Sequence, residues 1–273
     1  MIEQFHGPAT VREALTLKKR YQGRAAFLAG GTYLNSSDCH QQPKHFISLA
    51  GLGLDRIELK QGRVEIGALC TYQRLIEDRR VPEPLKAAAV QLASRNVRNM
   101  ATLGGHVASR VTNSDLIPML VALDAKLVLS RAGATRTLRV AEYVAKPVAG
   151  LITKLVLPKS KAGRIAACRN LRGSANGRSI VSAAVSATLV RGVVKDPIIA
   201  VGGLARSVVR VGAVERALHG RPLPALDELQ ALVSRAVRPA ATPLASAAFR
   251  RREAGAVVAL AFRDAFGKKG ARS

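Results

Sequence analysis

The spacing of hydrophobic and polar residues divides the chain into a short N-terminal segment, a mixed middle part and a C-terminal part that ends in helices. Near the N-terminus, apolar residues recur every three or four positions over 11–19, which predicts a helix capped by Thr10. Short apolar runs at 25–28 and 45–49 predict two strands. These elements are too few to bury a core of their own, so we expect them to pack on the middle part of the chain.

The middle of the chain mixes strands and helices. Alternating residues at 56–59 and 63–68 flank Gln61-Gly62 and predict a β-hairpin. The further elements predicted here are helices at 71–78, 82–93 and 115–123 and strands at 126–130, 137–140 and 151–157.

The C-terminal part begins with β-forming residues and ends with helical periodicity. The predicted elements are strands at 179–194 and 197–202 and helices at 211–218, 226–238 and 244–266. Strands followed by helices indicate an α+β architecture.

The charge of the chain is strongly positive: it has 43 Lys and Arg residues and only 18 Asp and Glu residues, which gives a formal charge of +25. Such a field attracts polyanions. The basic residues are nevertheless spread along the sequence, and aromatic residues make up only 4%, too few for base-stacking platforms. These features favour a solvated basic surface over a nucleic-acid partner, and they leave open docking to acidic subunits or attraction of an anionic dinucleotide.

The three cysteines, Cys39, Cys70 and Cys168, form no CxxC pair and exclude an iron–sulfur cluster held by four thiolates of this chain. Cys39-His40 has no second half of a metal site, so we expect no metal. No apolar run reaches the roughly 18 residues of a membrane span, and the N-terminal residues lack the apolar region of a secretory signal. We therefore expect a cytoplasmic protein without a membrane partner.

Two segments with adjacent glycines carry the clearest chemical signal, Gly30-Gly31 within 28–34 and Gly104-Gly105 within 102–106. Adjacent glycines allow positive φ angles and a close approach of the backbone, so that successive N–H groups can point at an anion. Two such turns suit a ligand with two linked phosphates, whereas the simpler alternative is two tight connections between strands. Asp115 opens the helix that comes after the second segment and could cap it.

The sequences LAGGTYL at 28–34, TLGGH at 102–106 and DLIP at 115–118 resemble the FAD-binding subunit of the molybdenum hydroxylases. That family includes bacterial xanthine dehydrogenases, carbon monoxide dehydrogenase and nicotinate-type hydroxylases. Its usual patterns are AGGT-D/N-L, T-I-G-G-N/D and a later D-L-x-P. The resemblance extends over nearly the whole chain.

The resemblance implies an α+β fold with a two-lobed FAD-binding domain of the vanillyl-alcohol-oxidase/p-cresol methylhydroxylase type at 1–160. Its lobes would span 1–50 and 51–160, and a small α+β C-terminal domain would span 161–273. The chain contains no Rossmann G-x-G-x-x-G motif, in keeping with this other way of binding a dinucleotide.

The resemblance also implies that both glycine segments hold the FAD pyrophosphate through backbone N–H groups, with the hydroxyls of Thr32 and Thr102 as further donors. Asp115 would hydrogen-bond the cofactor, a role compatible with capping, and Ile152 would present backbone groups to the flavin. Arg169 matches a family lysine and would stabilise negative charge on reduced flavin, or else is an exposed surface arginine. The cofactor-binding residues implied are Leu28, Ala29, Gly30, Gly31, Thr32, Tyr33, Leu34, Thr102, Gly104, Gly105, His106, Asp115, Ile152 and Arg169.

The chain departs from the family pattern at two places. His106 stands where the family has asparagine or aspartate, and residues 172–181 lack the aspartate of the family's R-x-x-x-D-I-A. These differences bear on contacts near the flavin and leave the two glycine segments intact.

The function implied is an electron-transfer subunit that takes electrons from a [2Fe-2S] subunit and passes them through FAD to NAD+ or another acceptor. Substrate hydroxylation would take place on a separate molybdopterin subunit, and no residue of this chain is assigned as a catalytic acid or base. One alternative is a self-sufficient FAD oxidase or reductase. The length of 273 residues argues against it, because it leaves little room for a substrate domain. The other is a basic nucleic-acid- or partner-binding protein that has lost FAD.

Overall fold

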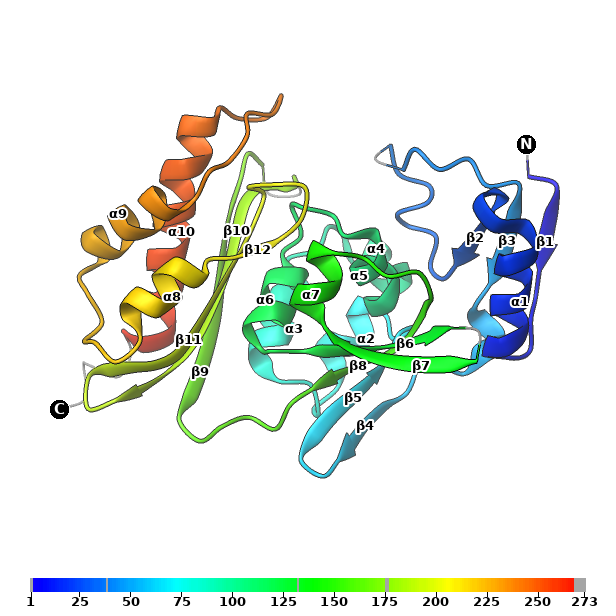
Figure 1. The fold of residues 1–273 in the computed structure, drawn as a ribbon, viewed down its shortest axis with the longest axis horizontal. Coiled ribbons are helices and arrows are strands. Elements are labelled where there is room, and N and C mark those ends of the chain that lie inside the picture. The colour runs from blue at the N-terminus through cyan, green and yellow to red at the C-terminus, as the bar shows by residue number, and fades with distance from the viewer. Residues whose placement is uncertain (1, 38, 132, 175–176, 268–273) are drawn as a thin grey trace.

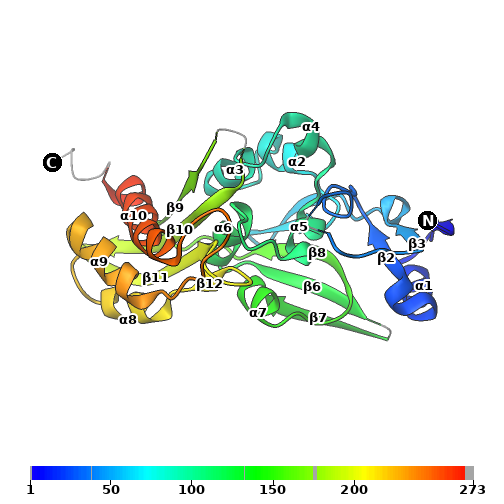
Figure 2. The same ribbon diagram turned by 90° about the horizontal axis from the view of Figure 1, so that it is seen from above.

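Three sheets succeed one another along the molecule in the computed structural model, which describes residues 2–37, 39–131, 133–174 and 177–267 (Figures 1 and 2). Each sheet packs against helices around a hydrophobic cluster of its own. The predicted mixture of helices and sheets is confirmed, with an N-terminal lobe, a middle part and a C-terminal part.

The N-terminal lobe is a parallel sheet in the order β1-β3-β2, covered by helix α1. Its elements are β1 (Gln4–His6), α1 (Val11–Tyr21), the 3-10 turn η1 (Gln22–Arg24), β2 (Ala25–Leu28), β3 (His45–Ser48) and η2 (Ala50–Leu52). Thr10 caps α1 as predicted, since its Oγ1 accepts a hydrogen bond from Glu13 N at 3.1 Å. The small core around Ala14 and Ile47 is completed by Leu151 from the next sheet, so the lobe packs on the middle part as expected.

The middle part is an antiparallel sheet in the order β4-β5-β8-β6-β7. Its strands are β4 (Ile57–Lys60), β5 (Arg63–Gly67), β6 (Lys126–Arg131), β7 (Ala134–Arg139) and β8 (Leu151–Leu157). Its helices are α2 (Tyr72–Glu77), α3 (Glu83–Val90), α4 (Arg95–Met100), α5 (Leu103–Ser109), α6 (Leu116–Ala122) and α7 (Val140–Ala145). The predicted hairpin is confirmed, with φ of 51° at Gln61 and 74° at Gly62, as a two-residue hairpin turn requires.

The C-terminal part is an antiparallel sheet in the order β12-β11-β10-β9 with three helices on its outer face (Figure 1). The elements are β9 (Arg164–Arg172), β10 (Ser179–Val190), β11 (Val193–Gly202), β12 (Val209–Arg210), α8 (Gly212–Leu218), α9 (Leu226–Ala236) and α10 (Ala247–Phe266). Strand β9 was not among the predicted elements. No helix within the described residues combines the length and the apolar character needed to cross a membrane.

Helix α6 joins the middle and C-terminal parts, because all of its residues are buried and it packs against β10 and β11. Ser182 Oγ donates to Ser114 O at 2.7 Å, and Gly203 N donates to Thr112 O at 2.7 Å. The segment just before α6 is therefore held by the C-terminal sheet, and its residues 113–115 also line a cavity between the parts of the molecule.

Candidate functional site

A cavity of about 540 Å³ lies where the three parts of the molecule meet. The two glycine segments line it, together with Ile152 of β8 and with Arg172 and Ser179 of the C-terminal sheet. Its volume falls within the range of roughly 300–1,000 Å³ that is usual for small-molecule and cofactor sites. Of the residues implied by the resemblance, all except Leu28 and Arg169 line this cavity.

The first glycine segment offers backbone donors to the cavity. Within the described residues, nothing accepts a hydrogen bond from the amide groups of Gly30, Gly31 or Thr32. Gly31 has a φ of 70°, which glycine adopts without strain. A Cβ atom at Gly30 would lie 1.7 Å from Met100 O, so only glycine permits the close approach of this segment to the end of α4. Unpaired amides at a cavity wall are suited to an anion.

The second glycine segment differs from the predicted turn, since Gly104 and Gly105 lie in the first turn of α5. Gly104 N donates to Ala68 O at 2.7 Å, and Gly105 N donates to Thr102 Oγ1 at 3.2 Å. The donor roles implied for these two amides are therefore wrong for this conformation, because the helix and its Thr102 cap already use them. A Cβ atom at Gly104 would lie 2.5 Å from Ala68 Cβ, which explains the glycine by packing.

Asp115 lies at the cavity wall, but it does not cap α6. The hydrogen bonds of a cap are made by Ser114, whose Oγ accepts from Leu116 N at 3.1 Å and from Ile117 N at 2.9 Å. The capping role considered for Asp115 is therefore wrong.

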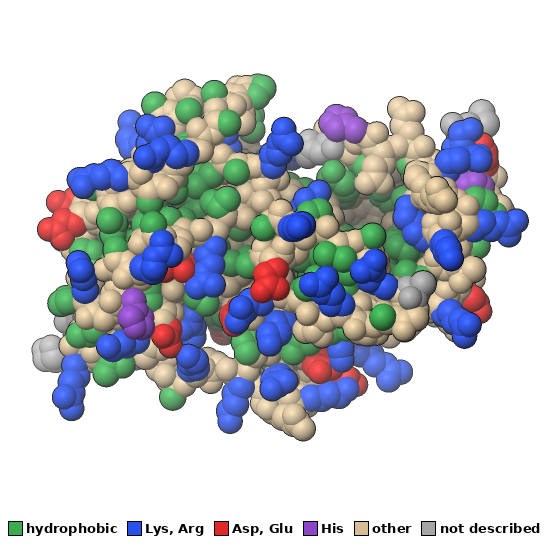
Figure 3. Space-filling view, in the orientation of Figure 1, with side chains coloured by type: hydrophobic (Ala, Val, Ile, Leu, Met, Phe, Trp, Pro, Cys, Tyr) green, Lys and Arg blue, Asp and Glu red, His purple; other side chains and the backbone are tan. Residues whose placement is uncertain are grey.

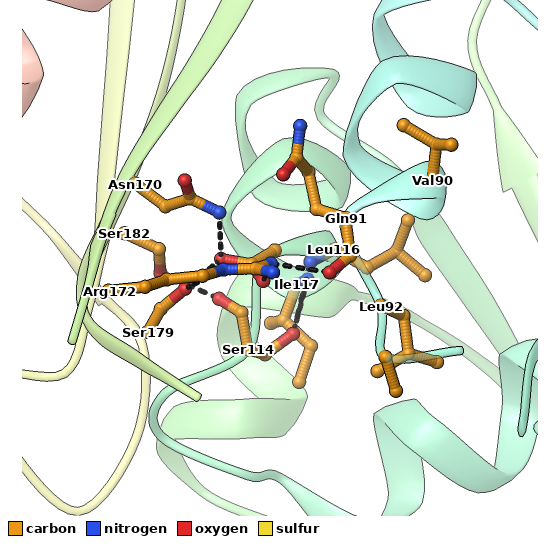
Figure 4. Close-up of polar contacts among 12 residues, drawn as sticks. Val90, Gln91, Leu92, Ser114, Leu116, Ile117, Asn170, Arg172, Ser179 and Ser182 are labelled. Carbon is orange, nitrogen blue, oxygen red and sulfur yellow. Dashed lines mark hydrogen bonds and ion pairs between the residues drawn. The ribbon is translucent and has the colours of Figure 1, made fainter. Parts of the chain in front are cut away.

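The Asp115 carboxylate is instead held by the C-terminal sheet, through Asn170, Arg172 and Ser179, which are labelled in Figure 4. It accepts hydrogen bonds from Asn170 Nδ2 at 3.0 Å, Ser179 Oγ at 2.6 Å and Arg172 Nη2 at 2.5 Å. The side chains of Asp115 and Arg172 are only 13% and 15% exposed, so this is a largely buried ion pair. Arg172 also donates to Gln91 O, which ties β9 to the end of α3.

His106 and Tyr72 form a neighbouring part of the cavity wall. His106 Nε2 lies 2.7 Å from Ser114 Oγ, and burial lowers the pKa of His106 to about 4. The edge of one ring meets the other, with 5.4 Å between their centroids. The buried Tyr72 hydroxyl has no hydrogen-bond partner in the described structure, and burial, with a smaller effect of the Asp115 charge, raises the pKa of Tyr72 well above its usual value.

Arg169 does not line the cavity, and its side chain is 47% exposed, which agrees with the alternative of a surface arginine. It points to the opposite side of β9 from Asn170, and its guanidinium pairs with Asp264 of α10. Leu28 is the last residue of β2 and also lies off the cavity wall. Arg172 and Tyr72 were not predicted as site residues. Arg172 is the arginine of the family's R-x-x-x-D-I-A segment, but its partner Asp115 lies far away in the sequence, and nothing in the linear pattern marks Tyr72.

Comparison with known proteins gives consistent matches over the chain. The model of the FAD binding domain in molybdopterin dehydrogenase matches residues 2–160, and that of the CO dehydrogenase flavoprotein C-terminal domain matches residues 166–265. The Escherichia coli K12 protein YgfM is 36% identical over 97% of this chain and 96% of its own length. The nicotinate dehydrogenase FAD-subunit of Eubacterium barkeri is 29% identical over 51% of this chain and 50% of its own length.

Among solved structures, carbon monoxide dehydrogenase from Hydrogenophaga pseudoflava contains a chain that superposes with a TM-score of 0.91 at 25% identity. The match covers 98% of each chain.

Proposed function

Because this chain belongs to the family of FAD-binding subunits of the molybdenum hydroxylases, we propose that it passes electrons from a [2Fe-2S] subunit through FAD to NAD+ or another acceptor. The chain is an oxidoreductase subunit whose cofactor is FAD. Substrate oxidation would take place on a separate molybdopterin subunit of the same complex.

The observation that carries this proposal is the row of unpaired amides at Gly30, Gly31 and Thr32 in a cavity of cofactor size. These N–H groups would hold the pyrophosphate, which is the anionic part of FAD. The residues of the first glycine segment therefore fit the pyrophosphate of FAD. The second glycine segment lines the cavity with the first turn of α5 and offers no free amides from its two glycines.

The other walls suit the remainder of the cofactor. Leu49, Leu69 and Ile152 would give apolar surface for a flat ring, while the buried Tyr72 hydroxyl is a polar group on the wall without a partner in the described structure. FAD supplies the redox chemistry when bound, and the protein supplies position and electrostatics. Within the described residues, no group of His, Cys, Asp and Glu side chains is arranged to hold a metal ion.

An absorbance spectrum of the purified protein, alone and co-expressed with its neighbouring subunits, tests the proposal. We expect the two visible bands of oxidised flavin, release of FAD on denaturation, and bleaching by NADH if NAD+ is the acceptor. A colourless protein in both preparations would contradict the proposal and favour a basic binding protein that has lost FAD.

The basic side chains are scattered over the face shown in Figure 3, with no single patch that would mark a polyanion site.

A further inference from the structure

The hydroxyl of Ser114 has only its hydrogen left to offer. Its oxygen accepts from Leu116 N at 3.1 Å and from Ile117 N at 2.9 Å, and these two bonds use both lone pairs. The third neighbour of this oxygen is His106 Nε2 at 2.7 Å. The Ser114 hydroxyl must therefore donate its hydrogen to Nε2.

This hydrogen bond decides the protonation of His106. A nitrogen that accepts a hydrogen bond carries no proton, and a neutral imidazole with a bare Nε2 carries its proton on Nδ1. Burial, which lowers the pKa of His106 to about 4, agrees with a neutral ring. Within the described structure, His106 Nδ1 has no hydrogen-bond partner, and His106 lines the cavity.

We propose that Ser114 fixes His106 as the Nδ1–H tautomer, so that a neutral His106 donates one hydrogen bond to an oxygen of the FAD bound in the cavity. This inference rests on the proposed function. His106 is the binding residue, and Ser114 is a positioning residue that acts through it. The edge-to-face contact with Tyr72 helps to hold the plane of the imidazole.

The tautomer makes a prediction about substitutions at residue 106. The Nδ2 of asparagine lies the same number of bonds from Cα as the Nδ1 of histidine, whereas the Nε2 of glutamine corresponds to the histidine Nε2. His106→Asn can therefore keep a donor in the place of Nδ1–H, and His106→Gln cannot. Asparagine is also one of the residues that the family pattern has at this position.

The tautomer can be measured by NMR on full-length protein with 15N-labelled histidine, with the His106 signals assigned by their loss in His106→Asn. Near neutral pH we expect a protonated Nδ1 and a bare Nε2, and loss of this preference in Ser114→Ala. Ser246→Ala is the matched control, because Ser246 Oγ caps α10 by accepting from Phe249 N at 3.2 Å. That variant loses a helix cap yet should leave the His106 signals unchanged. A protonated Nε2 in the wild-type protein would overturn the inference.

The donor role can be measured by titrating apoprotein with FAD and monitoring the quenching of flavin fluorescence. We expect His106→Asn to bind within about threefold of wild type and His106→Gln to bind about tenfold more weakly, the usual cost of one lost hydrogen bond. Equal affinities in wild type and both variants would overturn the donor role. Wild-type protein that binds no FAD would overturn the proposed function and the donor role with it, whereas the NMR signals would still decide the tautomer.

Discussion

At the scale of single residues, the ion pair between Asp115 and Arg172 is the contact whose loss should cost most. Both side chains are largely buried, and neutralising Asp115 removes the charge that this carboxylate sets against the Arg172 guanidinium. We expect Asp115→Asn to lower the free energy of unfolding by about 3 kcal/mol. Chemical denaturation of the apoprotein measures this change.

The chain provides a matched control in Asp264→Asn. Asp264 pairs with Arg169, whose side chain is 47% exposed, and exposed pairs contribute at most about 1 kcal/mol. If both variants lost the same free energy of unfolding, burial would not be the reason for the larger contribution expected of the Asp115 pair.

The depressed pKa of His106 predicts a specific dependence of stability on pH. Its folded value of about 4 lies below the ordinary value of 6.5, so the unfolded chain binds the proton more readily. The stabilising contribution is fully present above pH 6.5 and is lost as the pH falls towards 4. The difference is on the order of 3 kcal/mol.

Unfolding curves of wild type and His106→Asn across this window test the prediction. Carboxylates titrate there as well, so the expected result is a difference between the two proteins: the stability of the variant should fall less steeply below pH 6.5. Parallel pH profiles would contradict it.

At the scale of elements, the sequence predicts those whose pattern is local. Helix α1 and the β4–β5 hairpin have caps, turn residues and periodicity within a few positions of one another. Helix α5 could not be predicted in this way, because Leu-Gly-Gly-His has low helix propensity and the helix depends on the Thr102 cap and on the packing of Gly104 against Ala68.

Strand β9 was missed for a related reason. One of its sides carries Asn170 and Arg172 towards Asp115, and the other carries Arg169 towards α10. Polar residues on both sides remove the alternation of hydrophobic and polar positions that marks a half-buried strand. The partners of these side chains lie far away in the sequence, so only the tertiary structure shows why they are polar.

The contact between the first glycine segment and the end of α4 gives a prediction at this scale. In Gly30→Ala the new methyl group would meet the backbone oxygen of Met100, which cannot move aside without shifting α4. We expect a loss of about 3 kcal/mol in stability and little or no bound FAD. Gly23→Ala is the control, since nothing lies within 4 Å of its Cβ position. Thermal unfolding and flavin content report both effects, and a Gly30→Ala protein with normal flavin content would contradict the prediction.

At the scale of the whole molecule, the charge of +25 should act on the rate of cofactor binding. A positive field accelerates the approach of an anion, and salt screens it over about 10 Å at 0.1 M ionic strength. We expect the association rate of FAD with apoprotein, measured by stopped-flow fluorescence, to fall several-fold between low and moderate salt. Riboflavin, which lacks the pyrophosphate, is the control and should show little change. An equal salt dependence for the two ligands would exclude steering by this charge.

The resemblance in the glycine segments predicts the two-lobed FAD-binding fold. The matches to known proteins confirm the family. The resemblance indicates only that residues 172–181 bear on contacts near the flavin. That Arg172 and Ser179 face Asp115 across the cavity wall follows from the tertiary structure alone. Pairing of charges between residues far apart in the sequence cannot be read from the spacing of neighbouring residues.

The hold of β9 and β10 on Asp115 also limits how this protein can be recombined with its relatives. A chimera that grafts another protein's residues 161–273 onto this chain would inherit a different set of donors opposite the carboxylate. Unless the graft supplies groups equivalent to Arg172, Asn170 and Ser179, the junction would carry a buried negative charge without partners. Asp115 and its three partners in the C-terminal part have therefore to be exchanged together in any such chimera.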